Sequence, residues 1–108
     1  MSRQDSLEEN IRKETARKDD EALVFLLNDH RGRWFFQRLL QNCRVLESSF
    51  AGERETFYNE GRRAVGLDYL RQVSNLDMRC FRLKQQAELE YFDMLRCLEK
   101  KQREEDEL

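Results

Sequence analysis

The sequence contains no proline and only four glycines in 108 residues. Proline breaks helices and glycine weakens them, so helix formation meets few interruptions along the chain. Glu, Arg, Leu and Gln, which are abundant here, are all good helix formers. A chain of this length forms one domain. We therefore predict an all-α fold, a small helical domain of three to four helices with a long C-terminal helix.

Long apolar runs are also missing from the chain. No stretch approaches the roughly 20 apolar residues that a membrane span needs, and residues 1–20 are too polar for a signal peptide. We expect no membrane span and a protein that stays where it is made. The formal net charge is −2, and no segment carries a strong basic excess. Direct binding to nucleic acid is therefore not expected.

Side chains suited to catalysis are scarce. The one histidine, His30, has no Ser or Cys near it in sequence, and no phosphate-binding loop or zinc-protease motif is present. Three cysteines, Cys43, Cys80 and Cys97, are too far apart for a zinc site, and we interpret them as reduced thiols packed as small hydrophobic side chains. We expect a protein that is not an enzyme and that carries no cofactor or metal.

Three segments follow from the pattern of apolar and charged residues. The first, 1–19, is a charged arm, and we expect its helix to start near Ser6, where Ser6 and Glu9 fit a capping box. The second, 20–75, is the helical core, with Gly32 predicted as a helix stop or hinge and Thr56 as a helix N-cap. The third, 76–108, is a long helix with a charged tail.

Apolar residues recur every three or four positions through the third segment, from Leu76 to Leu98. They predict a helix of about 28 residues and roughly 40 Å, longer than the rest of a small domain can cover. We expect its far end to contact another chain, and a homo-oligomer. Between this helix and the one before it, residues 74–77 favour a break over a continuous helix.

Six of the 11 aromatic residues lie between residues 34 and 58, in a neighbourhood, 31–63, that also contains several arginines. Core packing explains most of them, while Trp, Tyr and Arg are also enriched at protein interfaces. We assign eight residues to a candidate partner interface: Trp34, Phe35, Phe50, Tyr58, Leu83, Tyr91, Met94 and Leu98. Phe50 is also expected to anchor the loop 47–55 in the core.

A second pattern joins glycines to a charged pair. Gly61 and Gly66 weaken a helix unless another helix passes close by, so both predict a close approach. Glu60 and Arg63 stand three residues apart, so they can pair with each other or reach the preceding helix. Together with Gly32 these four residues form the predicted structural motif, and a structural role is favoured over partner binding.

The order of these motifs resembles a known family. It consists of Gly32 followed by Trp34-Phe35-Phe36 and a helix ending in Leu39-Leu40-Gln41-Asn42-Cys43, then Phe50-Ala51-Gly52, then Glu60-Gly61-Arg62-Arg63-Ala64-Val65-Gly66. This order resembles a family of small helical proteins encoded among the structural genes of tailed phages, mostly short-tailed ones, and it covers about residues 20–73. The resemblance implies a virion or head-assembly component, with phage structural proteins as partners.

Two functions from different classes stay open at this point. One is a structural or assembly protein that binds a larger phage oligomer such as the portal, connector or capsid, or that is ejected with the DNA. The other is a small host-directed regulator that binds and inhibits a bacterial protein. For either function we expect the chain in the cytoplasm of the infected bacterium, and for the first also in the phage particle.

Overall fold

The computed structural model describes residues 2–45 and 53–108, and within them the fold is all-α. It contains four helices: α1 (Arg3–Asn28), α2 (His30–Asn42), α3 (Glu53–Ser74) and α4 (Met78–Asp106). The predicted long C-terminal helix is confirmed, since α4 has 29 residues. The predicted break before it is also confirmed. Asp77 caps α4, because its side chain accepts from the backbone amide of Cys80.

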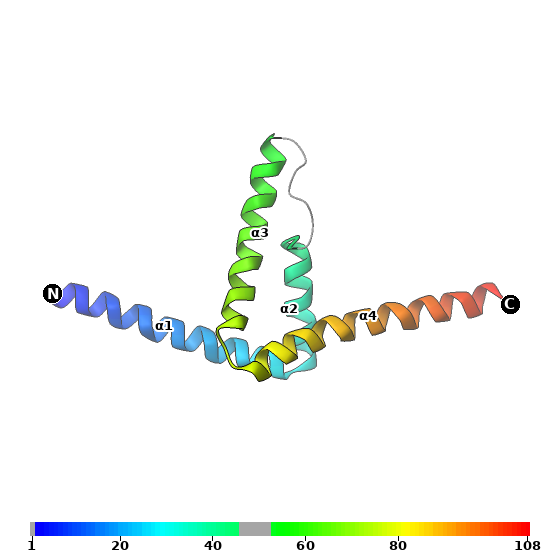
Figure 1. Ribbon diagram of the computed structural model, residues 1–108, viewed down its shortest axis with the longest axis horizontal. Helices are drawn as coiled ribbons and strands as arrows, with labels where there is room; N and C mark the ends of the chain where they lie inside the picture. Colours follow the sequence, from blue (N-terminus) through cyan, green and yellow to red (C-terminus); the bar gives the residue numbers. More distant parts are fainter. Residues whose placement is uncertain (1, 46–52) are drawn as a thin grey trace.

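The helices form an inverted T (Figure 1). Helices α2 and α3 lie side by side as an upright hairpin, and α1 and α4 cross at its base and run outward in opposite directions. The molecule measures 74 × 39 × 18 Å. Helices α1 and α4 together form the crossbar of the T, and the N- and C-termini lie at its two far ends (Figure 1).

Helix α1 starts earlier than its sequence predicts. Its N-cap is Ser2, which forms a capping box with Asp5, so the capping box predicted at Ser6 is wrong. Both boxes satisfy the amides of a first turn, but the one at Ser2 adds another turn of helix. Only Leu23 and Leu27 of α1 are buried, both near its C-terminal end.

The corner between α1 and α2 is a single residue, Asp29. Its backbone is extended, and its side chain accepts from the amide of Arg31 at 2.8 Å, which caps α2. The hydrogen bond from the Arg31 side chain and that from its backbone lower the pKa of Asp29 from 3.8 to about 2. Gly32 therefore lies inside the first turn of α2, and the prediction that it stops the helix is wrong.

Gly32 is needed for a different reason. A Cβ atom at this position would overlap the carbonyl oxygen of Leu26 and lie 2.7 Å from its carbonyl carbon. The last turn of α1 and the first turn of α2 thus pack backbone against backbone, which only glycine permits. The predicted hinge is a site of close approach.

The α2–α3 hairpin departs from the prediction at its upper end. Helix α2 ends at Asn42, and Arg44 adopts a positive φ of 56°. Helix α3 begins at Glu53, so Thr56 lies inside it and is not its N-cap. Residues 46–52, which include Phe50, lie outside the described residues, and so does the predicted anchor of the loop 47–55 at Phe50. Residues 53–55 of that predicted loop belong to α3.

The core fills the space where the hairpin meets the crossbar. Its largest fully buried side chains are Phe36, Leu27 and Val73, one from each of three helices. Helix α4 adds Cys80 and Ala87 from its first three turns. Cys43 and Cys80 are buried as predicted, and burial is the main cause that raises the pKa of Cys80. Cys97 is exposed on α4, so the prediction of a packed thiol is wrong there.

Candidate protein interaction site

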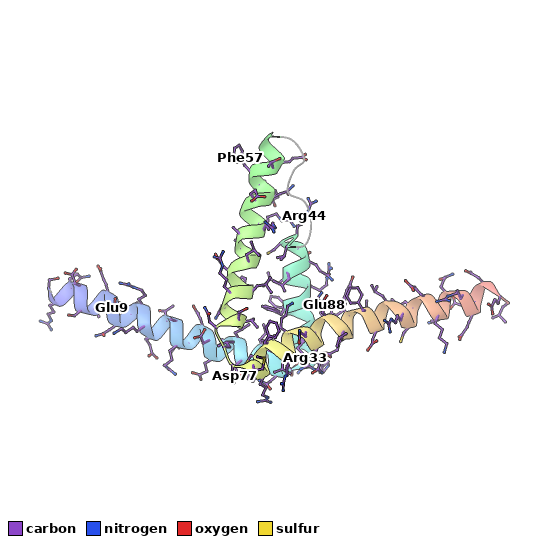
Figure 2. The ribbon with its side chains drawn as sticks, in the orientation of Figure 1. Glu9, Arg33, Arg44, Phe57, Asp77 and Glu88 are labelled. Carbon is purple, nitrogen blue, oxygen red and sulfur yellow. The ribbon has the colours of Figure 1, made fainter. Side chains whose placement is uncertain are left out.

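An ion pair joins α2 to α4 beside the core. The Arg33 guanidinium donates to both carboxylate oxygens of Glu90, at 2.5 and 3.4 Å, and to the carbonyl oxygen of Leu27 at 3.0 Å. The Arg33 side chain is only 11 % exposed, whereas that of Glu90 is 38 % exposed. One arginine thus ties the end of α1 and the middle of α4 to the start of α2. Figure 2 labels Arg33 where α4 passes α2.

An aromatic cluster lies next to this ion pair, at the surface. The ring centroids of Trp34 and Tyr91 are 5.8 Å apart, and those of Tyr91 and Phe92 are 5.9 Å apart with an edge-to-face tilt. Trp34 stays 46 % exposed and Phe92 48 %. The cluster presents aromatic surface that the described part of the chain leaves uncovered.

A shallow cleft opens beside the aromatic cluster. It has a volume of about 320 Å³ and is lined by His30, Arg31, Trp34, Ala87 and Glu90. Arg31 pairs with the capping carboxylate of the α1–α2 corner, at 3.3 Å. A cleft with an aromatic wall and an arginine at its rim has the composition of a protein-binding hot spot.

The predicted interface residues do not form one surface. Trp34 and Tyr91 are in contact, and Phe35 is 60 % exposed on the same helix as Trp34. Leu83 packs against the core cluster. Met94 and Leu98 follow Tyr91 along the same face of α4, towards its outer part. Tyr58 lies near the upper end of α3, away from the others, and Phe50 lies outside the described residues.

The structural motif divides in the same way. A Cβ at Gly66 would overlap Val45 and lie 2.7 Å from the Cβ of Cys43, so the predicted close approach is confirmed there. A Cβ built at Gly61 has no described atom within 4 Å, so the described part of the chain shows no close approach there. Glu60 is exposed, and Arg63 donates to the carbonyl oxygen of Val45 at 3.2 Å, reaching the end of the α2 segment.

The outer half of α1 is a solvated arm. Between Arg3 and Asp20 every side chain is exposed except Glu9, which is half-buried. Ion pairs of the i,i+3 and i,i+4 type run along it, such as Arg17 with Glu14 at 2.7 Å and with Glu21 at 2.9 Å. Such pairs support an isolated helix by only a few tenths of a kcal/mol each.

One exposed apolar face of α4 was not predicted from the sequence. Met78 and Leu89 are each 64 % exposed, and they lie on the side of the helix away from Cys80 and Ala87. The most regular apolar row of this helix is the buried one. A second row of apolar residues at helical spacing is the sequence signal that indicates the exposed face.

The fold defines the class of this protein: a small all-α protein with four helices in the part of the chain that the structure describes. No helix of the described residues is long and apolar enough to cross a membrane.

Residues 20–87 match the sequence model of the Bbp19-like phage protein family, which is well over half of the chain. The chain therefore belongs to the Bbp19-like phage proteins. The matched region starts where the sequence resemblance starts, and it continues through about the first third of α4. No curated protein and no solved structure matches the chain.

Proposed function

We propose that this protein is a non-enzymatic phage virion or head-assembly protein that acts through helix-mediated contacts with phage structural proteins. Its partner is the portal, connector or capsid, or the protein leaves the particle with the DNA. The observation that carries the proposal is the pair of outer helical arms. The outer part of α1 and the end of α4 project from the core and pack on no other described element.

Long solvated helices are poorly stabilised on their own. Isolated helices of about 12–15 residues are marginal in water, because most helix stability in proteins comes from packing an apolar face. The arm of α1 buries no apolar side chain before Leu23. Contact with a larger assembly would supply the packing that the chain itself does not give these arms.

The aromatic cluster supplies a second contact surface, on the rigid part of the molecule. Trp34 rests on Tyr91 beside the Arg33–Glu90 ion pair, so its position is fixed before a partner binds. A preorganised tryptophan loses little conformational freedom on binding, which favours affinity. The arms and this cluster together suit a protein that bridges parts of an assembly.

Quantitative mass spectrometry of purified phage particles, before and after DNA ejection, tests the proposal. A copy number close to that of a ring or shell component, retained after ejection, supports a portal, connector or capsid association. Copies lost on ejection support an ejected protein. Absence from particles and from assembly intermediates would overturn the proposal, and a single host protein recovered by pull-down from uninfected lysate would replace it with the host-directed regulator.

A variant pair sharpens this test. Trp34→Ala removes the exposed indole, and we expect it to lower incorporation into particles at least about tenfold if this cluster binds the partner. Phe57→Ala is the matched control, because Phe57 is 72 % exposed on α3, far from the cluster. Equal circular dichroism spectra of both variants would separate lost binding from lost folding.

A further inference from the structure

The outer face of α4 carries large apolar side chains that the described residues leave exposed. Met78, Phe81, Leu89 and Phe92 are 64, 37, 64 and 48 % exposed. Gln85, also exposed, lies at the centre of this row. All five lie within about 80° on the helix, which turns about 100° per residue. These five residues are defined here as the outer face of α4, and no charged side chain belongs to it.

The spacing of the outer face is symmetric about its centre. The steps from Met78 to Phe92 are three, four, four and three residues, with Gln85 in the middle. In a two-fold interface the contacts are reciprocal: if residue i of one copy contacts residue j of the second copy, residue j of the first also contacts residue i of the second. In an antiparallel pair of α4 helices, Met78 meets Phe92 of the second copy and Phe81 meets Leu89. Gln85 meets its own copy on the axis, where two amides can hydrogen-bond.

Charge around the outer face follows the same antiparallel order. Residues 78–85 carry three basic side chains and no acidic one, and residues 86–93 carry three acidic side chains and no basic one. The basic ones are Arg79, Arg82 and Lys84, and the acidic ones are Glu88, Glu90 and Asp93. Glu90 binds Arg33, Lys84 pairs with Glu88 on the same helix at 3.9 Å, and Arg79 donates to Asn28 of α1 at 2.8 Å. Arg82 and Glu88 flank the outer face on its two sides. An antiparallel pair sets opposite charges together, whereas a parallel pair sets like charges together.

The rest of the molecule leaves this approach open. The hairpin contacts α4 from one side, through residues such as Ala87 and Tyr91. In Figure 1 the first turns of α4 cross in front of α2, and nothing of the described chain lies in front of them. A second molecule can therefore stack on α4 with its own hairpin turned away.

We propose that the occupant of the outer face of α4 is a second copy of this chain, docked antiparallel about a two-fold axis at Gln85. This goes beyond the proposed function, because it concerns the purified chain alone and needs no other phage protein. Self-complementary apolar spacing and the charge order both select a second copy over an unrelated helix. The buried surface of one helix pair is at the low end for specific dimers, so a dissociation constant in the micromolar range is expected.

Sedimentation equilibrium of the purified chain measures the association. We expect a concentration-dependent rise from the 13.2 kDa monomer to twice that mass. Leu89→Arg puts a cation against the basic half of the second copy, and we expect it to raise the dissociation constant at least about tenfold. Arg71→Glu, at an exposed pair on α3, is the control and should leave association unchanged. A wild-type chain that stays monomeric at hundreds of micromolar would overturn the proposal.

Oxidative crosslinking tests the register. In a Gln85→Cys, Cys97→Ser variant the two new thiols meet on the axis, so we expect a disulfide-linked dimer. The exposed Cys97 of the wild type is the built-in control, because antiparallel pairing about Gln85 keeps the two Cys97 residues about 36 Å apart. Crosslinking through Cys97 and not through position 85 would refute the antiparallel arrangement, even if a dimer forms.

Discussion

The same substitution at three glycines should change stability in opposite directions. At Gly61 an added Cβ meets no atom of the described residues within 4 Å, so Gly61→Ala gains the helix propensity of alanine, about 1 kcal/mol. At Gly66 the Cβ would overlap Val45 and press on the Cβ of Cys43 at 2.7 Å. Both are atoms of short side chains that cannot swing away. Overpacking of this kind costs about 1–3 kcal/mol, which outweighs the gain in propensity.

At Gly32 the overlap is with the backbone of Leu26, including its carbonyl carbon at 2.7 Å. Backbone in a helix moves only if the whole α1–α2 corner opens, which would also pull Leu27 from the core. We expect Gly32→Ala to lose about 3 kcal/mol or more.

Urea unfolding followed by circular dichroism measures all three variants at one protein concentration, so that association does not differ between them. The expected order of stability is Gly61→Ala, wild type, Gly66→Ala and then Gly32→Ala. If Gly32→Ala proved as stable as Gly61→Ala, the close packing of the α1–α2 corner would be refuted.

Three further predictions concern single groups. Arg33→Met keeps the aliphatic stem but removes a nearly buried guanidinium, so we expect the free energy of unfolding in urea to fall by about 1.5–3 kcal/mol. Arg71→Met is the control: both partners of its ion pair are exposed, so its free energy of unfolding should stay within about 0.5 kcal/mol of the wild type. Because the pKa of Asp29 is lowered from 3.8 to about 2, the contribution of its carboxylate to stability is present above pH 3.8 and is lost as the pH falls towards 2. Thermal unfolding between pH 5 and 2 should therefore show a fall in stability, and this fall should be smaller in Asp29→Asn. In the native protein a thiol reagent should modify Cys97 rapidly and Cys80 only on unfolding, because Cys80 is buried with a raised pKa; equal rates would contradict the packing of α4.

Helix content and the long α4 were predictable because they depend on local chemistry. The lack of proline and the three-to-four residue spacing of apolar side chains act within one helix. The break before α4 was predictable for the same reason. The corner at Asp29 was not, because Gly32 offers a stronger local signal for a helix stop, and only the packing against Leu26 explains that glycine.

The arrangement of surfaces depends on the tertiary structure, which spacing alone does not give. Leu83 and Leu89 both belong to apolar rows on α4, yet Leu83 packs on the core and Leu89 is exposed. Which row faces inward is decided by α2, whose Arg33 and Trp34 meet Glu90 and Tyr91. Gly61 and Gly66 likewise look equivalent in sequence, but only Gly66 lies where the chain after α2 crosses α3.

We propose that this Bbp19-like protein binds phage structural proteins through its arms and aromatic cluster. Lysine-directed crosslinking and mass spectrometry of purified particles and assembly intermediates tests it most directly, since Lys13 and Lys18 lie on the α1 arm and Lys100 and Lys101 on the end of α4. We expect crosslinks from these lysines to a portal, connector or capsid protein. Crosslinks from the infected cell that join the arms only to a bacterial protein would contradict it.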